Sequence, residues 1–185
     1  MILPIVAYGS NVLRSACKEI DSSYPNLDQL IENMFETMYA ASGVGLAAPQ
    51  INKSIRLFIV DTSPFKDDES PDHVVCKKIF INPKITSLTG ESWSFSEGCL
   101  SIPEVREDVK RLSEITIEYF DKDFNKHTEI YDGLNARVIL HEYDHIEGIL
   151  FVDKISPLRK RMIKGKLKDI SNGTLNANYL IRSFK

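Results

Sequence analysis

Residues 134–150 form the stretch that decides the fold, Leu-Asn-Ala-Arg-Val-Ile-Leu-His-Glu-Tyr-Asp-His-Ile-Glu-Gly-Ile-Leu. If this stretch is helical, His141 and His145 lie one turn apart on one face, with Cβ atoms roughly 5–6 Å apart, close enough to bind one metal ion. Glu142 then lies beside the metal and not on it. This arrangement is typical of hydrolases in which a metal activates water and a carboxylate carries the proton.

The surroundings of this motif favour a metal site. Two of the four histidines of the chain lie here, and Leu134 and Val138 fall on the same helical face as His141 and His145. The alternative is a solvated helix with two surface histidines. Because the two histidines share their face with apolar residues, we expect that face to be buried, which favours a metal site over a solvated helix.

The third ligand of such a site must come from elsewhere in the chain. A mononuclear catalytic site usually has three protein ligands, and the extended protease motif supplies the third from a later histidine. Here Gly148 fits that motif, but Phe151 stands at the histidine position, and no Glu follows Glu147. We therefore expect an upstream ligand, and Cys99 is the best candidate because it sits in a glycine-bearing break after a strand.

Length and composition predict one ordinary globular domain. A chain of 185 residues, 43% hydrophobic and 26% charged, can bury about 70% of its unfolded surface. No run approaches the ~20 apolar residues of a membrane span, and the first residues lack the features of a signal peptide. We expect a cytoplasmic protein with neither membrane nor DNA among its partners.

The cysteine count argues against a disulfide framework. Cys17, Cys76 and Cys99 are an odd number, widely spaced in a chain without an export signal. We interpret Cys17 and Cys76 as plain buried or surface thiols.

Charge is unevenly distributed along the chain. Residues 151–185 hold nine of the 23 Lys and Arg but only two of the 26 Asp and Glu, so the tail carries about +7 and the rest about −10. After Pro157, residues 158–170 have the pattern of a basic amphipathic helix that Gly173 ends. This helix is either a solvated face or a contact with ribosomal RNA.

Periodicity predicts the remaining elements. A helix follows Asn26, whose side chain can cap it, and ends at Gly43. Strands are expected at residues 55–60, at 78–85 with Pro83 at an edge or bend, and at 115–120 with a hairpin partner at 127–131. Gly90 is expected in a turn, and residues 61–73 in a surface loop. The small residues of Gly43–Gln50 indicate close backbone approach to a packed neighbour or to a ligand.

Three motifs resemble those of the peptide deformylase family, in its order and at its separations: Gly43-Val-Gly-Leu-Ala-Ala-Pro-Gln50, Glu97-Gly-Cys-Leu-Ser101 and His141-Glu-Tyr-Asp-His145. They span most of the chain. The resemblance implies an α+β fold in one domain, residues 1–185. Antiparallel strands would pack around a central helix carrying His-Glu-x-x-His, with an N-terminal helix and a C-terminal helix.

The resemblance also implies the reaction. The protein would remove the N-formyl group from the initiator methionine of new bacterial polypeptides and release formate. Cys99, His141 and His145 would bind one divalent metal, in this family usually Fe²⁺, with Zn²⁺, Ni²⁺ or Co²⁺ as alternatives. Water on the metal would attack the formyl carbon, and Glu142 would take its proton and pass it to the leaving amine. A thiolate with two imidazoles suits iron or zinc better than magnesium or calcium.

The remaining site residues come from the same resemblance. The Gln50 amide and the Leu100 backbone N–H would meet the oxyanion, and Gly45 would offer backbone contact to the substrate. The methionine pocket and its supporting groups would be Val44, Phe95, Leu134 and Val138, with Glu97 and Arg137 nearby. Glu104, where the family often has glycine, and Leu140, where glutamine is frequent, depart from the common pattern without removing a ligand.

Two other functions fit part of this pattern. A metallopeptidase shares the metal, the water and Glu142, but it must admit an internal peptide bond, whereas formyl is the smallest acyl group. A structural zinc domain needs a fourth protein ligand to close the site. The sequence offers no convincing fourth ligand.

We predict that Cys99→Ala greatly lowers the metal content of the purified protein, because two imidazoles alone hold a divalent ion weakly. Cys17→Ala and Cys76→Ala are the matched controls and should keep the wild-type content. Metal analysis after anaerobic purification measures all three variants. Full metal occupancy in Cys99→Ala would rule this cysteine out as a ligand.

Overall fold

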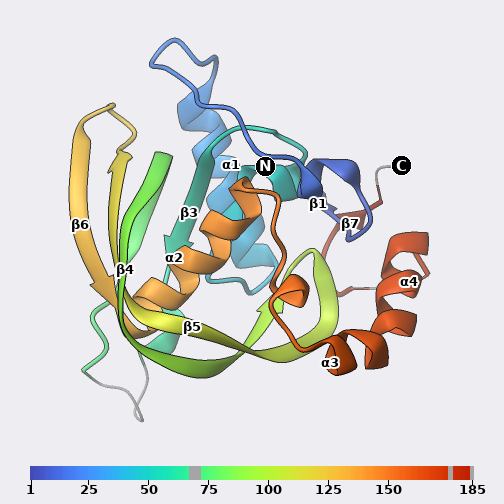
Figure 1. Ribbon diagram of the computed structural model, residues 1–185. Coiled ribbons are helices and arrows are strands. Elements are labelled where there is room, and N and C mark those ends of the chain that lie inside the picture. Colours follow the sequence, from blue (N-terminus) through green and yellow to red (C-terminus); the bar gives the residue numbers. More distant parts are fainter. Residues whose placement is uncertain (67–71, 175–176, 184–185) are drawn as a thin grey trace.

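The computed structural model describes residues 1–66, 72–174 and 177–183, and it combines helices with an antiparallel sheet (Figure 1). This confirms the α+β prediction at the level of mixed helix and antiparallel sheet. The five-stranded sheet has the order β2-β3-β4-β5-β6, so consecutive strands are neighbours throughout. Its strands are β2 (Gly45–Ala47), β3 (Leu57–Asp61), β4 (Lys77–Cys99), β5 (Ile102–Phe120) and β6 (Lys126–Asp132).

Helix α2 (Gly133–Ile146) carries the two histidines and lies within the curve of the sheet, as Figure 1 shows. It follows β6 directly, and Asp132 stands at its N-cap in extended conformation. Apolar residues of α2, including Ala136 and Ile139, pack in one cluster with Phe58, Phe80 and Ile117 of the sheet. Nearly every side of α2 is buried, because part of its surface packs against the sheet and another part faces the site. This burial fixes the position of the helix.

The β4–β5 hairpin is longer than the sequence indicated. The predicted strand at residues 78–85 continues to Cys99, and Pro83 lies where the pairing register shifts between Ile81 and Lys84. The prediction of a turn at Gly90 is wrong. This glycine has φ +80° and lies inside β4 at another register shift, between Thr89 and Ser92. Such irregularities bend a strand without ending it, which explains why local pattern suggested a turn.

The turn of this hairpin lies where the sequence indicated only a break in the pattern. Cys99 pairs with Ile102, so Leu100 and Ser101 alone connect β4 to β5. Cys99 is therefore the last residue of β4, and the pairing register shifts between Gly98 and Cys99, where the sequence pattern breaks. This two-residue connection places the Cys99 thiol at the tip of the β4–β5 hairpin.

Helix α1 (Leu27–Ala40) lies where a helix was predicted after Asn26, although it ends before Gly43. Asn26 does precede it, but in left-handed conformation with φ 55° and without a side-chain capping bond. Met34 and Met38 of α1 pack in one cluster with Leu46 and Ile59 of the sheet. This helix therefore supports the strands that lead into the glycine-rich motif.

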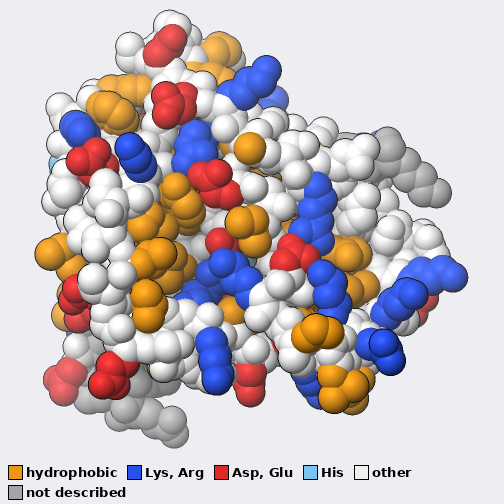
Figure 2. Space-filling view, in the orientation of Figure 1, with side chains coloured by type: hydrophobic (Ala, Val, Ile, Leu, Met, Phe, Trp, Pro, Cys, Tyr) orange, Lys and Arg blue, Asp and Glu red, His pale blue; other side chains and the backbone are white. Residues whose placement is uncertain are grey.

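The C-terminal part holds two helices where one was predicted. Helices α3 (Pro157–Met162) and α4 (Lys164–Asn172) meet at buried Ile163, and Gly173 ends α4. Lys and Arg side chains gather on the surface over α3 and α4 (Figure 2). A short parallel pairing that periodicity did not indicate joins the two chain ends, β1 (Ile5–Val6) with β7 (Ile181–Arg182).

Short 3₁₀ turns complete the described chain: η1 (Asn11–Arg14), η2 (Ala48–Ile51), η3 (Ser63–Phe65) and η4 (Phe151–Asp153). Of the surface loop predicted at residues 61–73, Asp61 belongs to β3, η3 forms one part, and residues 67–71 lie outside the described residues. Among the described residues, the helices are too short or too polar to cross a membrane.

Candidate active site

Three candidate ligands converge between the sheet and α2. Cys99 comes from the end of β4, and His141 and His145 come from α2. Their potential ligand atoms all lie within 4.8 Å of one another, and the Cys99 Sγ is 3.2 Å from the His145 Nε2. His145 is buried behind the other two residues, with 1% of its surface exposed. The structure thus brings together the three residues that the sequence singled out.

Glu97 orients the imidazole of His141. Its Oε2 lies 3.0 Å from the Nδ1 of His141, which leaves the Nε2 of that ring for the metal. Burial lowers the pKa of the His141 imidazole, but hydrogen bonds to Cys99 and Glu97 outweigh this and raise the pKa above its ordinary value. Burial, followed by the charge of His141, lowers the pKa of His145. A proton held among these groups is what a divalent cation would displace.

A buried ion-pair network fixes Glu97 in turn. Arg111 of β5 donates to both Glu97 oxygens, at 2.7 and 2.9 Å, and to Asp144 of α2 at 2.6 Å. Arg137 adds a bond of 3.0 Å to Glu97. Burial opposes ionisation of Glu97, yet the bonds from Arg111 and His141 hold its pKa well below the usual range. Glu97 is therefore a carboxylate whose oxygens are fully engaged within the protein.

Glu142 lies on the inner wall beside the ligands. Only 4% of its surface is exposed, and its Oε2 has no hydrogen-bond partner among the described residues. Burial raises the pKa of Glu142 to about 7. A Cβ on Gly45 would lie 2.5 Å from the Oε1 of Glu142, so only glycine allows β2 to approach this carboxyl. An orphaned carboxyl of this pKa can hold or release a proton near neutral pH.

Gln50 and the turn of the β4–β5 hairpin supply polar groups next to Cys99. The Oε1 of Gln50 accepts the Ala47 backbone N–H at 2.8 Å, which fixes the orientation of the amide. Its Nε2 therefore faces the Cys99 Sγ at 3.5 Å and the Ser101 Oγ at 3.3 Å. Leu100 follows Cys99 directly, so its backbone N–H belongs to the same short turn.

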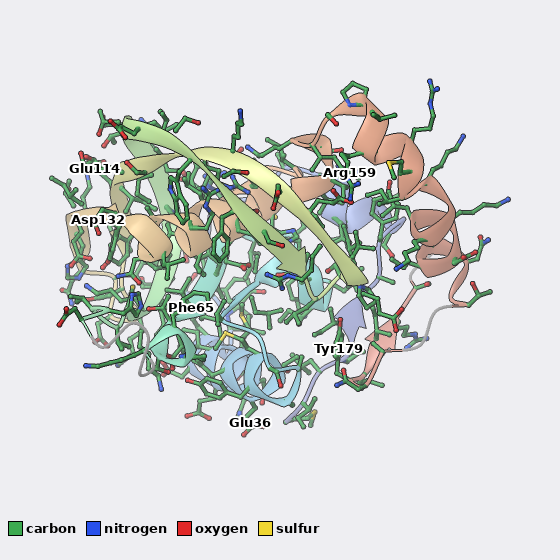
Figure 3. The ribbon with its side chains drawn as sticks, turned by 90° about the horizontal axis from the view of Figure 1, so that it is seen from below. Glu36, Phe65, Glu114, Asp132, Arg159 and Tyr179 are labelled. Atoms are coloured by element: carbon green, nitrogen blue, oxygen red, sulfur yellow. The ribbon has the colours of Figure 1, made fainter. Side chains whose placement is uncertain are left out.

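These groups line a cleft of about 730 Å³. In Figure 3 the labelled Phe65 and Tyr179 lie on opposite sides of it. Most predicted site residues line the cleft, namely Val44, Gly45, Gln50, Phe95, Glu97, Cys99, Leu100, Arg137, Val138, His141 and Glu142. Leu134 is half-buried and does not line it. Glu104 lines the rim with φ +59°, whereas Leu140 packs in the core away from it.

The donor set fits a resident divalent metal of the iron or zinc type. One thiolate and two imidazoles form a borderline-soft site with positions left for water or substrate. Within the described ranges, no other group of three or more metal-binding side chains is found, and no fourth protein ligand joins this one. This argues against a closed structural zinc site. Cys17 and Cys76 are buried free thiols, as predicted.

Arg111 is the main site residue that the sequence reasoning missed. Its position shares the parity of Val109, Ile115 and Ile117 along β5, all of which are buried. A period-2 reading extended back from Ile115 would have placed the charge of Arg111 inward, next to an acidic partner. Tyr179 was missed as well, because nothing in the local pattern links residue 179 to the cleft.

We predict that Arg111→Met lowers the free energy of unfolding by about 3 kcal/mol, since Glu97 and Asp144 stay buried after losing their shared partner. Arg137 and Lys154 remain and moderate the loss. Lys110→Met is the matched control, because Lys110 is the exposed neighbour on the same strand, and we expect a change within about 0.5 kcal/mol. Urea unfolding measures both, and equal stability of the two variants would contradict the importance of the network.

Comparisons with known proteins agree with this geometry. The sequence profile of one family, described as Polypeptide deformylase, matches residues 2–161. Peptide deformylases of Christiangramia forsetii and Flavobacterium psychrophilum are 60% and 58% identical to the chain, covering 98% of it and 96% and 97% of their own lengths. The crystal structure of a peptide deformylase from Legionella pneumophila, 36% identical, superposes with a TM-score of 0.80 over 93% of this chain and 96% of that one. The chain therefore belongs to the polypeptide deformylase family, metal-dependent hydrolases that remove the N-formyl group from the initiator methionine of new polypeptides.

Proposed function

We propose that Cys99, His141 and His145 hold one divalent ion, Fe²⁺ in the cell, and that deformylation takes place in the cleft beside it. The observation that carries the proposal is the convergence of these three ligand atoms within 4.8 Å, next to a buried carboxyl with an unpartnered oxygen. Zn²⁺, Ni²⁺ and Co²⁺ suit the same donors. When bound, the ion supplies Lewis acidity, which activates water and polarises the formyl carbonyl.

Glu142 acts as the general base and then as the general acid. Its pKa of about 7 allows the carboxyl to take a proton from water and return it to the leaving amine. A nearby divalent cation would lower this pKa, because it favours the carboxylate, and would bias the resting residue toward the base. The close approach of β2 at Gly45, where a Cβ would lie 2.5 Å from the Glu142 Oε1, limits the space in which this carboxyl can move.

Gln50 and Leu100 stabilise negative charge on the formyl oxygen. The amide of Gln50 is fixed by its bond to Ala47, so its Nε2 donates into the cleft without reorganising. The N–H of Leu100 is the second donor. Fixed dipoles of this kind stabilise a transition state more than they stabilise the substrate.

The methionine side chain occupies the apolar part of the cleft. Val44, Phe95 and Val138 line it, and the backbone at Gly45 faces the first residues of the peptide. Glu97 and Arg137 contribute by orienting the site, because their polar groups are largely engaged with each other and with Arg111 and His141. Leu134, the other residue predicted for this pocket, lies outside the cleft.

Residues 1–185 form a single domain, and α2 is the element that carries most of the reacting site. Helix α2 provides two ligands and the general base, and it packs against β2, β3, β5 and β6. The substrates are N-formylmethionyl nascent peptides, which arise at the ribosome. The cytoplasm is therefore the compartment in which the enzyme acts.

We predict that Glu142→Gln keeps its metal but lowers kcat/KM for formyl-Met-peptides by about 10²- to 10⁴-fold, since the proton carrier is lost while the ligands remain. Formate release and metal content are measured on the same preparation. Glu147→Gln is the matched control at the C-cap of the same helix, where Glu147 pairs with Arg56 and does not line the cleft. Near-normal turnover by Glu142→Gln would refute the assigned role.

The basic surface of α3 and α4 supports a further part of this proposal, contact with ribosomal RNA. Some of its cations are engaged, because Arg159 pairs with Glu107 and Lys160 with Asp153. Arg161, Lys164 and Lys168 are exposed, and no ion pair holds them within the ranges that the structure describes. Figure 2 shows Lys and Arg side chains gathered over α3 and α4, and unpaired cations in such a group suit a phosphate backbone.

We predict that reversing Arg161, Lys164 and Lys168 to Glu weakens ribosome binding and removes most of its salt dependence, because each lost phosphate contact lowers the slope by roughly 0.7–0.9. Co-sedimentation at several salt concentrations measures this. Deformylation of free peptides should stay unchanged. A control triple reversal of Lys84, Lys110 and Lys126, which are exposed on the sheet and of which Lys126 pairs with Glu118, should leave ribosome binding intact. Equal effects of the two triples would contradict the proposed contact.

A further inference from the structure

The C-terminal segment lies beyond the part of the chain that the family profile matches, yet it returns to the cleft. The profile ends at residue 161, whereas Ala177, Asn178 and Tyr179 line the cleft together with Cys99 and His141. In Figure 3 the labelled Tyr179 lies on the side opposite Phe65. This wall is therefore formed by residues outside the family's matched region.

Tyr179 makes one specific contact with the turn between β4 and β5, at Leu100. Its hydroxyl donates to the backbone carbonyl of Leu100 at 2.7 Å, and the side chain is partly buried. Leu100 is one of only two residues in the turn between Cys99 and Ile102. The phenol thus bonds the residue whose N–H faces the reacting group in the proposed mechanism.

Segments near both ends of the chain form hydrogen bonds to the turn at Leu100 and Ser101, and these two segments also pair with each other. The backbone N–H of Tyr8 donates to the Ser101 carbonyl at 2.8 Å. The parallel pairing of β1 with β7 then joins the segment before Tyr8 to the segment after Tyr179. Its backbone bonds include Ile5 N–H to the Leu180 carbonyl and Ala7 N–H to the Arg182 carbonyl, both 2.9 Å.

We propose that Tyr179 is a positioning residue, which holds the Leu100 carbonyl so that the Leu100 N–H keeps its direction toward the formyl oxygen. The inference rests on the proposed role of Leu100 as an oxyanion donor. The peptide units on the two sides of Leu100 are linked through its φ and ψ. A bond that anchors the carbonyl therefore restricts the orientation of the N–H.

The expected effect is modest and lies in the chemical step. A neutral hydrogen bond of this kind contributes about 0.5–1.5 kcal/mol, which corresponds to roughly a two- to thirteenfold change in rate. Donation to the oxyanion matters most in the transition state. Loss of positioning should therefore lower kcat and kcat/KM together and leave KM almost unchanged.

The test is Tyr179→Phe, which keeps the ring and removes only the hydroxyl. We expect kcat for formyl-Met-Ala-Ser to fall by about three- to tenfold, with unchanged KM, melting temperature and metal content. Leu180→Ala is the matched control, because Leu180 is the exposed next residue and its backbone bond to Ile5 is retained. This variant should keep wild-type kinetics.

Three outcomes would overturn the inference. Wild-type kcat in Tyr179→Phe would show that the hydroxyl is not needed. A fall in activity that follows a loss of metal or of melting temperature would indicate a purely structural bond. A rise in KM alone would make Tyr179 a substrate contact. Failure of the wild-type enzyme to release formate would instead refute the proposed function, so the two failures are distinguishable.

Discussion

The carboxylate of Glu97 is the interaction on which the rest of the site depends. It lies on β4, bonds Arg111 of β5, and bonds Arg137 and His141 of α2. A buried charge is stable only when its hydrogen bonds are satisfied, so these three elements cannot separate without a large loss of stability. The same bonds that join the hairpin to the helix also turn the His141 ring toward the other ligands. Stability and metal geometry are thus coupled through one residue.

A second constraint is steric. Helix α2 lies so close to β2 that a Cβ at position 45 would lie 2.5 Å from the Oε1 of Glu142. A side chain at position 45 would push Glu142 out of the site or push the strand away. Gly43 is under a similar constraint, because a Cβ there would lie 2.8 Å from the Leu100 side chain. The glycines of this motif therefore set the width of the cleft.

Much of the site could be predicted from sequence because its chemistry is local. His141, Glu142 and His145 lie within one turn and a half of helix, and the missing downstream ligand pointed upstream to Cys99. The helix after Asn26 and the β5–β6 hairpin followed from periodicity for the same reason, whereas the single helix predicted near the C-terminus is two helices, α3 and α4. What sequence reasoning missed depends on pairing between distant segments. The local sequence around Gly90 resembles that of a turn. Only the pairing of β4 with β5 shows that the strand continues past a bulge there. The approach of Tyr179 to Leu100 depends on the pairing of two chain ends, for which two-residue strands leave no periodic signal.

Preorganisation explains why so many bonds support so few reacting atoms. Each group proposed to face the formyl oxygen or the water is held by a second group that does not react. Ala47 holds the Gln50 amide, and Gly45 confines Glu142. A donor that must rotate during the reaction loses part of its advantage to reorganisation, whereas a fixed donor does not. Cys99 and Leu100 would be the exception, because they lie at the tip of a long hairpin where a sheet is least supported. Hydrogen bonds from both chain ends to Leu100 and Ser101 restrain this tip. The C-terminal segment therefore contributes to the preorganisation of the site, as the buried carboxylate of Glu97 does.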